Sequence, residues 1–415
     1  MANETLGSLK NLPTNMKHTL SNRVQHCFNV IQVQCGYNVM DYAGNRPFLN
    51  NNMDTPNEAF WRTIDAIVTK ALEHRLYVAM VPMWGDEYGK AFGNDSQKAY
   101  RFGQWIGKRY AAHSHVLWIV SGEYDAINGY RLPISAEQKS VFISMARGLR
   151  EAHNGAQLMT IHPGEALTSS KDFHEEPWLD FNMLQSGHLI DSAAYKMPDT
   201  HELIARDYAL TPIKPVLDGE PIYEDTPDGI WVHRDTNRTR AGASDVRRKA
   251  YCAVFAGAFG HTYGHNDVYG FFEPAYPGQV QTLPKGPGQR SSWKTALDAP
   301  GAAQMKHLRR LMESRSHLDR IPDQSIIAAG QSGGLEHIQA TRASDGTWAL
   351  VYLPAGKPVT IAMDTLAGPK IEASWFNPRT GETRSIGTFP NSGNREFPPP
   401  TSGENNDWVL VLESK

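Results

Sequence analysis

Short apolar runs alternate with amphipathic helical patterns along residues 28–313. Runs rich in Val, Ile and Leu are typical of strands buried on both faces, and helices between such strands indicate parallel βαβ units. So many repeats in succession predict a (β/α)8 barrel, that is, an α/β fold of the TIM-barrel type. The predicted strands lie at residues 28–34, 76–84, 116–122, 158–162, 181–185, 215–220 and 262–272.

The eighth strand of a closed barrel would have to lie at the N-terminus. Residues 1–9 are polar and have little β propensity, so we expect the first barrel strand to be missing or degraded. A barrel with a gap would expose two unpaired strand edges, which closed barrels avoid. The sequence therefore favours an N-terminally shortened chain over a natural seven-stranded barrel.

After residue 322 the pattern changes to short strands separated by turns, which is typical of a small all-β sandwich. We therefore expect two domains, a barrel over residues 1–322 and a C-terminal β-sandwich over residues 323–415. The strands predicted in the second domain lie at residues 335–341, 348–353, 359–363, 371–376 and 408–412.

Composition restricts the class of protein. The 415 residues carry a net charge of −3, which gives no reason to expect nucleic acid as a partner. No apolar leader and no window of about 18 apolar residues occurs, so neither a signal peptide nor a membrane span is predicted. Three cysteines, Cys27, Cys35 and Cys252, are too few for a disulfide framework and are expected to be buried free thiols.

Two glutamates follow predicted strands. Glu123 ends the segment VLWIVSGE, and Glu220 ends the segment PVLDGE. The carboxyl ends of barrel strands open onto one face, so these two side chains are expected to converge. One protonated and one ionised carboxyl group are what the hydrolysis of a glycosidic bond requires. The alternative is that each acid pairs with an arginine in the rim of the barrel.

Histidines occur near the same predicted face, and His261, Tyr263 and His265 alternate in the segment HTYGH, as on one side of a strand. Substrate hydrogen bonding, zinc ligation and a structural role all stay open for His162, His188, His261 and His265. The absence of an H-x-E-x-x-H pattern and of nearby cysteines argues against zinc, so we expect neither metal nor cofactor. Further substrate-binding candidates at or just after strand ends are Trp84, Gln185 and Tyr223.

Longer segments carry a family resemblance. They are FNVIQVQ, LYVAMVPMWG, FGQWIGKRYA, VLWIVSGEYD, FNMLQSGH, KPVLDGEPIYED, AVFAGAFGHTYGHNDV and LDRIPDQSII. Together they resemble the apiosidase-like barrels of glycoside hydrolase family 140. The later segment ASWFNPRTGE resembles a module labelled as a collagen-binding domain of a collagenase.

The resemblance implies roles for the two glutamates. It implies that Glu220 is the nucleophile-type carboxylate and that Glu123 is the acid/base. The family usually has Gly-Gly-Asp where this chain has Ser121-Gly122-Glu123, so the acid is one methylene longer here.

The implied activity is the release of apiose from side chains of rhamnogalacturonan-II in pectin, by an exo-acting and retaining enzyme. An oligosaccharide or polysaccharide is then the partner, an extracytoplasmic location is suggested by the family alone, and the sandwich is a structural domain packed on the barrel. Two alternatives stay open. One is another pectin or hemicellulose glycosidase, arabinofuranosidase-like or endo-acting, and the other is a non-catalytic glycan-binding protein.

Overall fold

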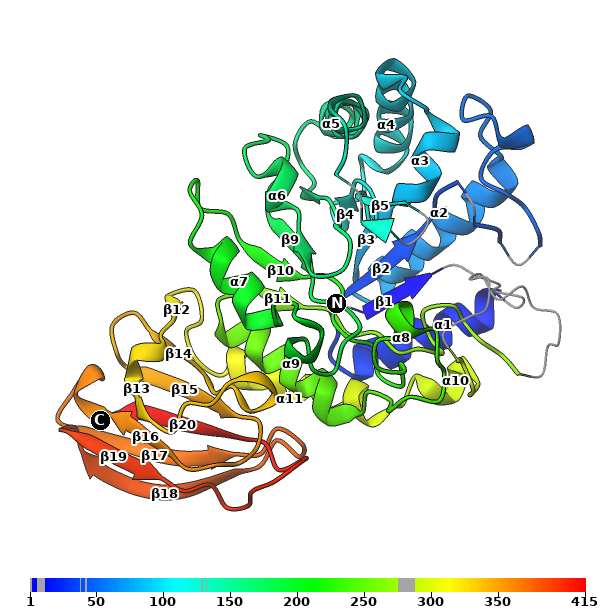
Figure 1. Cartoon of the computed structure of the whole chain (residues 1–415). Helices are drawn as coiled ribbons and strands as arrows, with labels where there is room; N and C mark the ends of the chain where they lie inside the picture. Colours follow the sequence, from blue (N-terminus) through cyan, green and yellow to red (C-terminus); the bar gives the residue numbers. More distant parts are fainter. Residues whose placement is uncertain are drawn as a thin grey trace.

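The structure is a computed structural model of the chain. It describes residues 2–5, 12–37, 39–41, 43–127, 130–131, 133–274 and 288–415. Figure 1 shows two parts, a barrel with a surrounding layer of helices and a C-terminal β-domain drawn in orange to red at one side of it. The predicted combination of a TIM barrel and a β-sandwich is confirmed. None of the described helices has the length and apolar character needed to cross a membrane.

The barrel wall consists of parallel strands in two hydrogen-bonded groups. The first group follows the order β1-β2-β3-β4-β7, and the second follows β11-β10-β9 with the antiparallel β8 at its edge. The groups meet where the Asp180 N–H donates to the Met159 carbonyl oxygen at 2.9 Å. The strands are β1 (Ala2–Thr5), β2 (Val30–Gln34), β3 (Tyr77–Val81), β4 (Val116–Ile119), β7 (Met159–Thr160), β8 (Leu167–Thr168), β9 (Asn182–Gln185), β10 (Val216–Asp218) and β11 (Gly260–His261).

The N-terminal strand corrects one prediction. Ala2–Thr5 forms β1 and pairs in parallel with β2, with Ala2 opposite Ile31 and Thr5 opposite Gln34. The expectation was a first strand either missing or degraded; a missing strand is wrong for these residues, and a degraded, polar strand is what the structure has, whereas residues 6–9 lie outside the described part. Backbone pairing with a neighbouring strand does not need apolar side chains, so the polar sequence concealed the strand.

The last barrel strand also differs from its prediction. A strand was predicted over residues 262–272, but β11 covers only Gly260–His261. Isolated bridges follow instead, such as the one between Glu224 and His265. At Gly264 the loop backbone lies directly against the Tyr223 ring, since a Cβ there would be 2.1 Å from Cδ1 of the tyrosine.

Helices follow the strands and cover the barrel. In α2 the Asn57 side chain accepts the Ala59 N–H, and the buried face of that helix includes Phe60, Ile64 and Val68, at the spacing of an amphipathic helix. The helices are α1 (Leu12–Gln25), α2 (Glu58–Glu73), α3 (Gly85–Ala91), α4 (Ser96–Tyr110), α5 (Ala136–Ala152), α6 (Ser170–Phe173), α7 (Thr200–Tyr208), α8 (Ile230–His233), α9 (Ala243–Phe255), α10 (Trp293–Ala296) and α11 (Pro300–Glu313).

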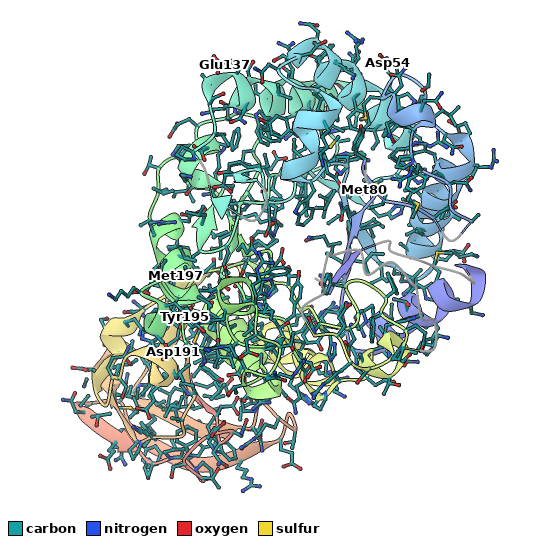
Figure 2. The ribbon with its side chains drawn as sticks, turned by 45° about the vertical axis from the view of Figure 1, so that its right-hand side comes forward. Asp54, Met80, Glu137, Asp191, Tyr195 and Met197 are labelled. Atoms are coloured by element: carbon teal, nitrogen blue, oxygen red, sulfur yellow. The ribbon has the colours of Figure 1, made fainter. Side chains whose placement is uncertain are left out.

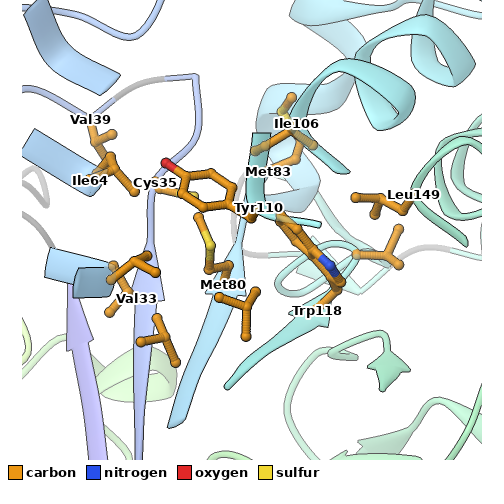
Figure 3. Packing of buried hydrophobic residues seen from close by; sticks show 14 of the residues in the cluster. Val33, Cys35, Val39, Ile64, Met80, Met83, Ile106, Tyr110, Trp118 and Leu149 are labelled. Carbon is orange, nitrogen blue, oxygen red and sulfur yellow. The ribbon is translucent and has the colours of Figure 1, made fainter. Parts of the chain in front are cut away.

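One large apolar cluster lies between the strands and these helices. Figure 3 shows Met80 and Trp118 from β3 and β4 packed near Ile106 and Tyr110 of α4. The only polar atom of the Trp118 side chain, Nε1, donates to Oε1 of Gln157 at 2.7 Å, so this buried indole is fully satisfied. Figure 2 shows Met80 inside the molecule and Glu137 at its outer edge.

The C-terminal domain consists of two antiparallel sheets around a second core. Predicted strands at 348–353, 359–363, 371–376 and 408–412 coincide closely with observed ones. The strand predicted at 335–341 begins only at Gln339, because residues 334–336 form a 3-10 helix. The larger sheet contains β12 (Arg320–Pro322), β14 (Gln339–Ala343), β15 (Trp348–Leu353), β20 (Trp408–Ser414), β17 (Lys370–Phe376) and β18 (Thr383–Pro390). The smaller one contains β13 (Ile327–Ala329), β16 (Val359–Ala362) and β19 (Asn394–Phe397). The division of the chain at residue 322 stays a prediction.

Buried polar and aromatic contacts join the two domains. Arg247 of α9 donates to both carboxylate oxygens of Asp407, at 2.7 and 2.9 Å, and both side chains are buried. The Tyr352 hydroxyl also donates to Asp407, at 3.1 Å, and the Tyr352 ring stacks on Tyr251 with the centroids 4.8 Å apart. The sandwich therefore packs on α9 through a desolvated ion pair surrounded by aromatic rings.

Removing the cation of this pair is expected to destabilise the protein strongly. In Arg247→Met the Asp407 carboxylate stays buried without its partner, which costs about 3–5 kcal/mol. Urea unfolding of the full chain measures this loss. The matched control is Lys357→Met at the exposed Lys357–Glu336 pair, where we expect less than about 1 kcal/mol. Equal midpoints for the two variants would show that the interdomain pair does not stabilise the fold.

Candidate active site

Glu123 and Glu220 lie at the carboxyl end of the barrel. Glu220 comes two residues after the end of β10, and Glu123 comes four residues after the end of β4. A parallel bridge between Trp84 and Gly122 extends the pairing of β3 and β4 towards Glu123. Because both strands run in the same direction around the barrel, both acids lie at the same rim.

Three side chains surround the Glu220 carboxylate. The Tyr223 hydroxyl donates to Oε1 at 2.6 Å, and Nε2 of His188 lies 3.1 Å from the same oxygen. Nε2 of His162 lies 3.1 Å from the other oxygen, Oε2. Glu220 itself is only 6% exposed, so these groups take the place of water around the anion.

This surrounding determines the charge of Glu220. Burial acts to raise its pKa, but the contacts with His162 and His188 outweigh burial and hold the pKa well below that of an ordinary glutamate. The reverse holds for the two imidazoles: burial lowers their pKa, and the neighbouring Glu220 carboxylate raises it further than burial lowers it. Glu220 is therefore an anion throughout the physiological pH range.

Glu123 has the opposite shift. Burial raises its pKa, and the negative charge of Glu220 raises it further. Hydrogen bonds to the carboxylate from Trp84, whose Nε1 lies 3.2 Å from Oε2, and from Gln185 oppose this rise only in part. The site thus contains one carboxyl group that favours its proton and one that does not.

His162 contacts both acids. Its Nδ1 accepts the backbone N–H of Glu123 at 3.4 Å, while its Nε2 faces Glu220. The imidazole therefore lies between the backbone of one acid and the carboxylate of the other. Glu123 has a φ of 36°, in the left-handed region that favours glycine, so its backbone is strained where it meets His162.

Glycines let Trp84 and Glu123 approach each other. A Cβ on Gly122 would lie 2.2 Å from Cε3 of Trp84, and a Cβ on Gly85 would lie 2.0 Å from the carbonyl oxygen of Glu123. Neither position can hold a larger residue without moving its neighbour. The Trp84 ring in turn lies beside His162, with centroids 5.9 Å apart.

Of the remaining predicted residues, His261 lies at a strand end, whereas Tyr263 and His265 lie in the loop after it. His261 ends β11, and burial lowers its pKa to about 3, so its imidazole is neutral. Tyr263 donates to Oε2 of Glu224 at 2.7 Å and packs on Phe28, and Nδ1 of His265 accepts the Asp267 N–H at 3.0 Å. The structure thus gives Tyr263 and His265 partners outside the glutamate pair, because β11 ends before the alternation predicted in HTYGH can continue.

Two aromatic residues near the acids were not predicted. The Trp231 ring lies 6.5 Å from that of His188, and the Tyr269 ring lies 5.6 Å from that of Tyr223. Trp231 comes from α8, where strand-end reasoning gives no signal, and Tyr269 lies within residues 262–272, which were predicted as a strand but are mostly loop. Within the described residues, no three or more His, Cys, Asp or Glu side chains are grouped so as to hold a metal ion.

Two family models match the chain. The model described as "Apiosidase-like, catalytic domain" matches residues 9–319. The chain belongs to the apiosidase-like family. A second model, "Putative collagen-binding domain of a collagenase", matches residues 321–413, over the β-domain. No curated protein matched the chain.

Solved structures agree with this membership. A protein titled "Glycoside hydrolase" is 30% identical, with a TM-score of 0.86, and the match covers 99% of this chain and 92% of the other. A glycoside hydrolase family 5 structure from Bacteroides vulgatus ATCC 8482 is also 30% identical, with a TM-score of 0.87, covering 99% and 88%. This apiosidase-like protein is therefore a glycoside hydrolase, with a carbohydrate as its substrate.

The opposite pKa shifts predict opposite effects on stability when each acid becomes neutral. Above about pH 4.3, the ordinary glutamate value, the raised pKa of Glu123 means that its ionisation destabilises the fold, so Glu123→Gln should unfold at a higher temperature than the wild type at pH 7. Below that pH the carboxyl is protonated in both states and the gain should disappear.

Glu220→Gln serves as the contrasting variant. The depressed pKa of Glu220 stabilises the fold above about pH 4.3, so replacing this glutamate should cost about 1.5–3 kcal/mol at pH 7, as expected for removing hydrogen bonds to a buried charge. Thermal unfolding from pH 4 to pH 8 measures both variants. Shifts of the same sign at pH 7 would contradict the assigned charges.

Proposed function

We propose that this glycoside hydrolase is an exo-acting, retaining apiosidase that removes apiose from side chains of rhamnogalacturonan-II in plant pectin. The observation that carries the mechanism is the opposite tuning of the two carboxyl groups, with Glu220 held as an anion and Glu123 favouring its proton. Family membership supports the apiosyl substrate.

Glu220 is the nucleophile in this proposal. Its carboxylate attacks the anomeric carbon while the bond to the leaving-group oxygen breaks, and a covalent glycosyl-enzyme forms. His162, His188 and Tyr223 hold the two oxygens in place, so the attacking atom needs little reorganisation. In a retaining enzyme the two carboxyl groups lie about 5–5.5 Å apart, and we expect this separation here.

Glu123 supplies and then recovers the proton. It donates its proton to the glycosidic oxygen, so that the leaving group departs as a neutral alcohol. Once Glu220 is esterified, the negative charge that raised the pKa of Glu123 is gone. The pKa of Glu123 then falls, so its carboxylate stays ionised and can accept a proton from the attacking water, and that water releases the sugar and frees Glu220.

Trp84, Gln185 and His261 are proposed to contact the substrate. The first two already donate to Glu123, so their positions border the bond to be cleaved. His261 lies at the end of β11, next to β10, and its Cα pairs with that of Asp218. In this proposal each of them binds hydroxyl groups of the sugar that lies at the nucleophile.

Two glutamine variants test the roles. Glu123→Gln should lower kcat/KM on an apiosyl oligosaccharide by about 10²–10⁴-fold. On a dinitrophenyl apioside, whose leaving group needs no proton, the rate of the glycosylation step should change little. Glu220→Gln should lose both activities. Chromatographic quantification of released apiose, with arabinosyl substrates in parallel, measures this. Release of arabinose alone would favour a different glycosidase, and wild-type turnover by Glu220→Gln would exclude the proposed nucleophile.

The pH profile of kcat/KM should reflect the same two groups. The acidic limb should lie below the ordinary glutamate range, because the pKa of Glu220 is lowered, and the alkaline limb should lie above it, because the pKa of Glu123 is raised. On the apiosyl oligosaccharide, whose leaving group does need a proton, the residual activity of Glu123→Gln should lack the alkaline limb. Retention of that limb in the variant would mean that another group supplies the proton.

A further inference from the structure

An exposed tryptophan lies near the nucleophile. Trp231 is on the four-residue helix α8 and is 36% exposed, whereas the preceding Ile230 is buried. The Trp231 ring lies 6.5 Å from the His188 ring, and His188 in turn contacts the Glu220 carboxylate at 3.1 Å. A single side chain therefore separates this indole from the group proposed to attack the sugar.

The loop that carries Trp231 is firmly anchored. Asp228 accepts the Ile190 N–H and the Tyr195 hydroxyl, both at 2.8 Å, and Arg238 donates to the Tyr195 oxygen at 2.9 Å. Gly229 has a φ of 61°, and a Cβ there would lie 2.4 Å from the Tyr195 hydroxyl, whose position Figure 2 shows. These contacts fix the backbone of the loop immediately before α8, which carries the indole.

A cation accompanies the indole. The guanidinium carbon of Arg234 lies 5.6 Å from the centroid of the Trp231 ring. Arg234 is exposed, and within the described part of the chain its side chain takes part in no ion pair of 4.0 Å or less. By contrast, Arg238 and Arg240 in the same loop are paired with Asp228 and Asp225.

We propose that Trp231 and Arg234 form a subsite for a uronic acid residue of the glycan next to the bond that is cleaved. The indole supplies a flat apolar surface for the C–H face of the sugar ring. The guanidinium supplies paired N–H donors for the sugar carboxylate. The position of the subsite relative to the cleaved bond rests on the proposed function, whereas the recognition of a uronate does not.

Binding of trigalacturonate and of its methyl ester, measured by calorimetry on the full chain, tests the subsite. The wild type should bind the acid more tightly than the ester. Trp231→Ala should lower the affinity for both ligands by about tenfold, and Trp231→Phe should recover part of that affinity. Arg234→Met should lower only the affinity for the acid, trigalacturonate, by up to about fivefold, and this effect should be smaller at high salt.

Val232→Ala is the matched control, because Val232 is the exposed neighbour on α8 and should leave binding of both ligands unchanged. Wild-type binding by Trp231→Ala, or equal losses of acid and ester in Arg234→Met, would overturn the subsite, as would a wild type that binds neither ligand. Apiose release by the same preparations is measured separately, so loss of the proposed activity is distinguishable from loss of the subsite.

Discussion

The site depends on keeping one carboxylate ionised inside the protein. An anion removed from water is strongly disfavoured unless hydrogen-bond donors replace its hydration shell. Tyr223, His188 and His162 do this for Glu220, and each comes from a different part of the barrel rim. The charge thus preserved acts on Glu123 and favours its protonated form. This buried anion therefore adds to burial in favouring the proton on Glu123.

The barrel gives these groups their mutual positions. Parallel pairing of β10 with both β9 and β11 places Leu184, Asp218 and His261 at neighbouring register positions. Residues that follow these strands then meet at one rim although they are far apart in the chain. Glycines at 85 and 122 let the Trp84 segment and the Glu123 segment come into direct contact. The interdomain ion pair of Arg247 with Asp407 holds the β-domain against α9, the helix that precedes β11.

Sequence reasoning worked where a strand was apolar and its end carried a chemically active residue. The prediction of the barrel and of the β-domain is confirmed, and the strand-end argument selected Glu123, Glu220, His162, Gln185 and His188, which the structure gathers at one rim. It was wrong where backbone pairing outweighed side-chain pattern. The polar β1 was not expected, and the predicted strand at 262–272 is mostly loop. Tyr263 and His265 therefore do not alternate along a strand, and their predicted contact with substrate stays a prediction.

Two things could be determined from the sequence alone: that parallel strands alternate with helices, and that acids follow two of those strands. Both are local properties, since periodicity and strand ends are read within a few residues. The family resemblance implied which glutamate is the acid/base, but only the tertiary structure shows why the two carboxyl groups differ in pKa. That difference depends on donors such as His188 and Tyr223 converging on Glu220 but not on Glu123, and on the charge of one acid acting on the other across space. The same holds for Trp231, whose place beside His188 follows from how a loop is anchored and not from any pattern in its residues.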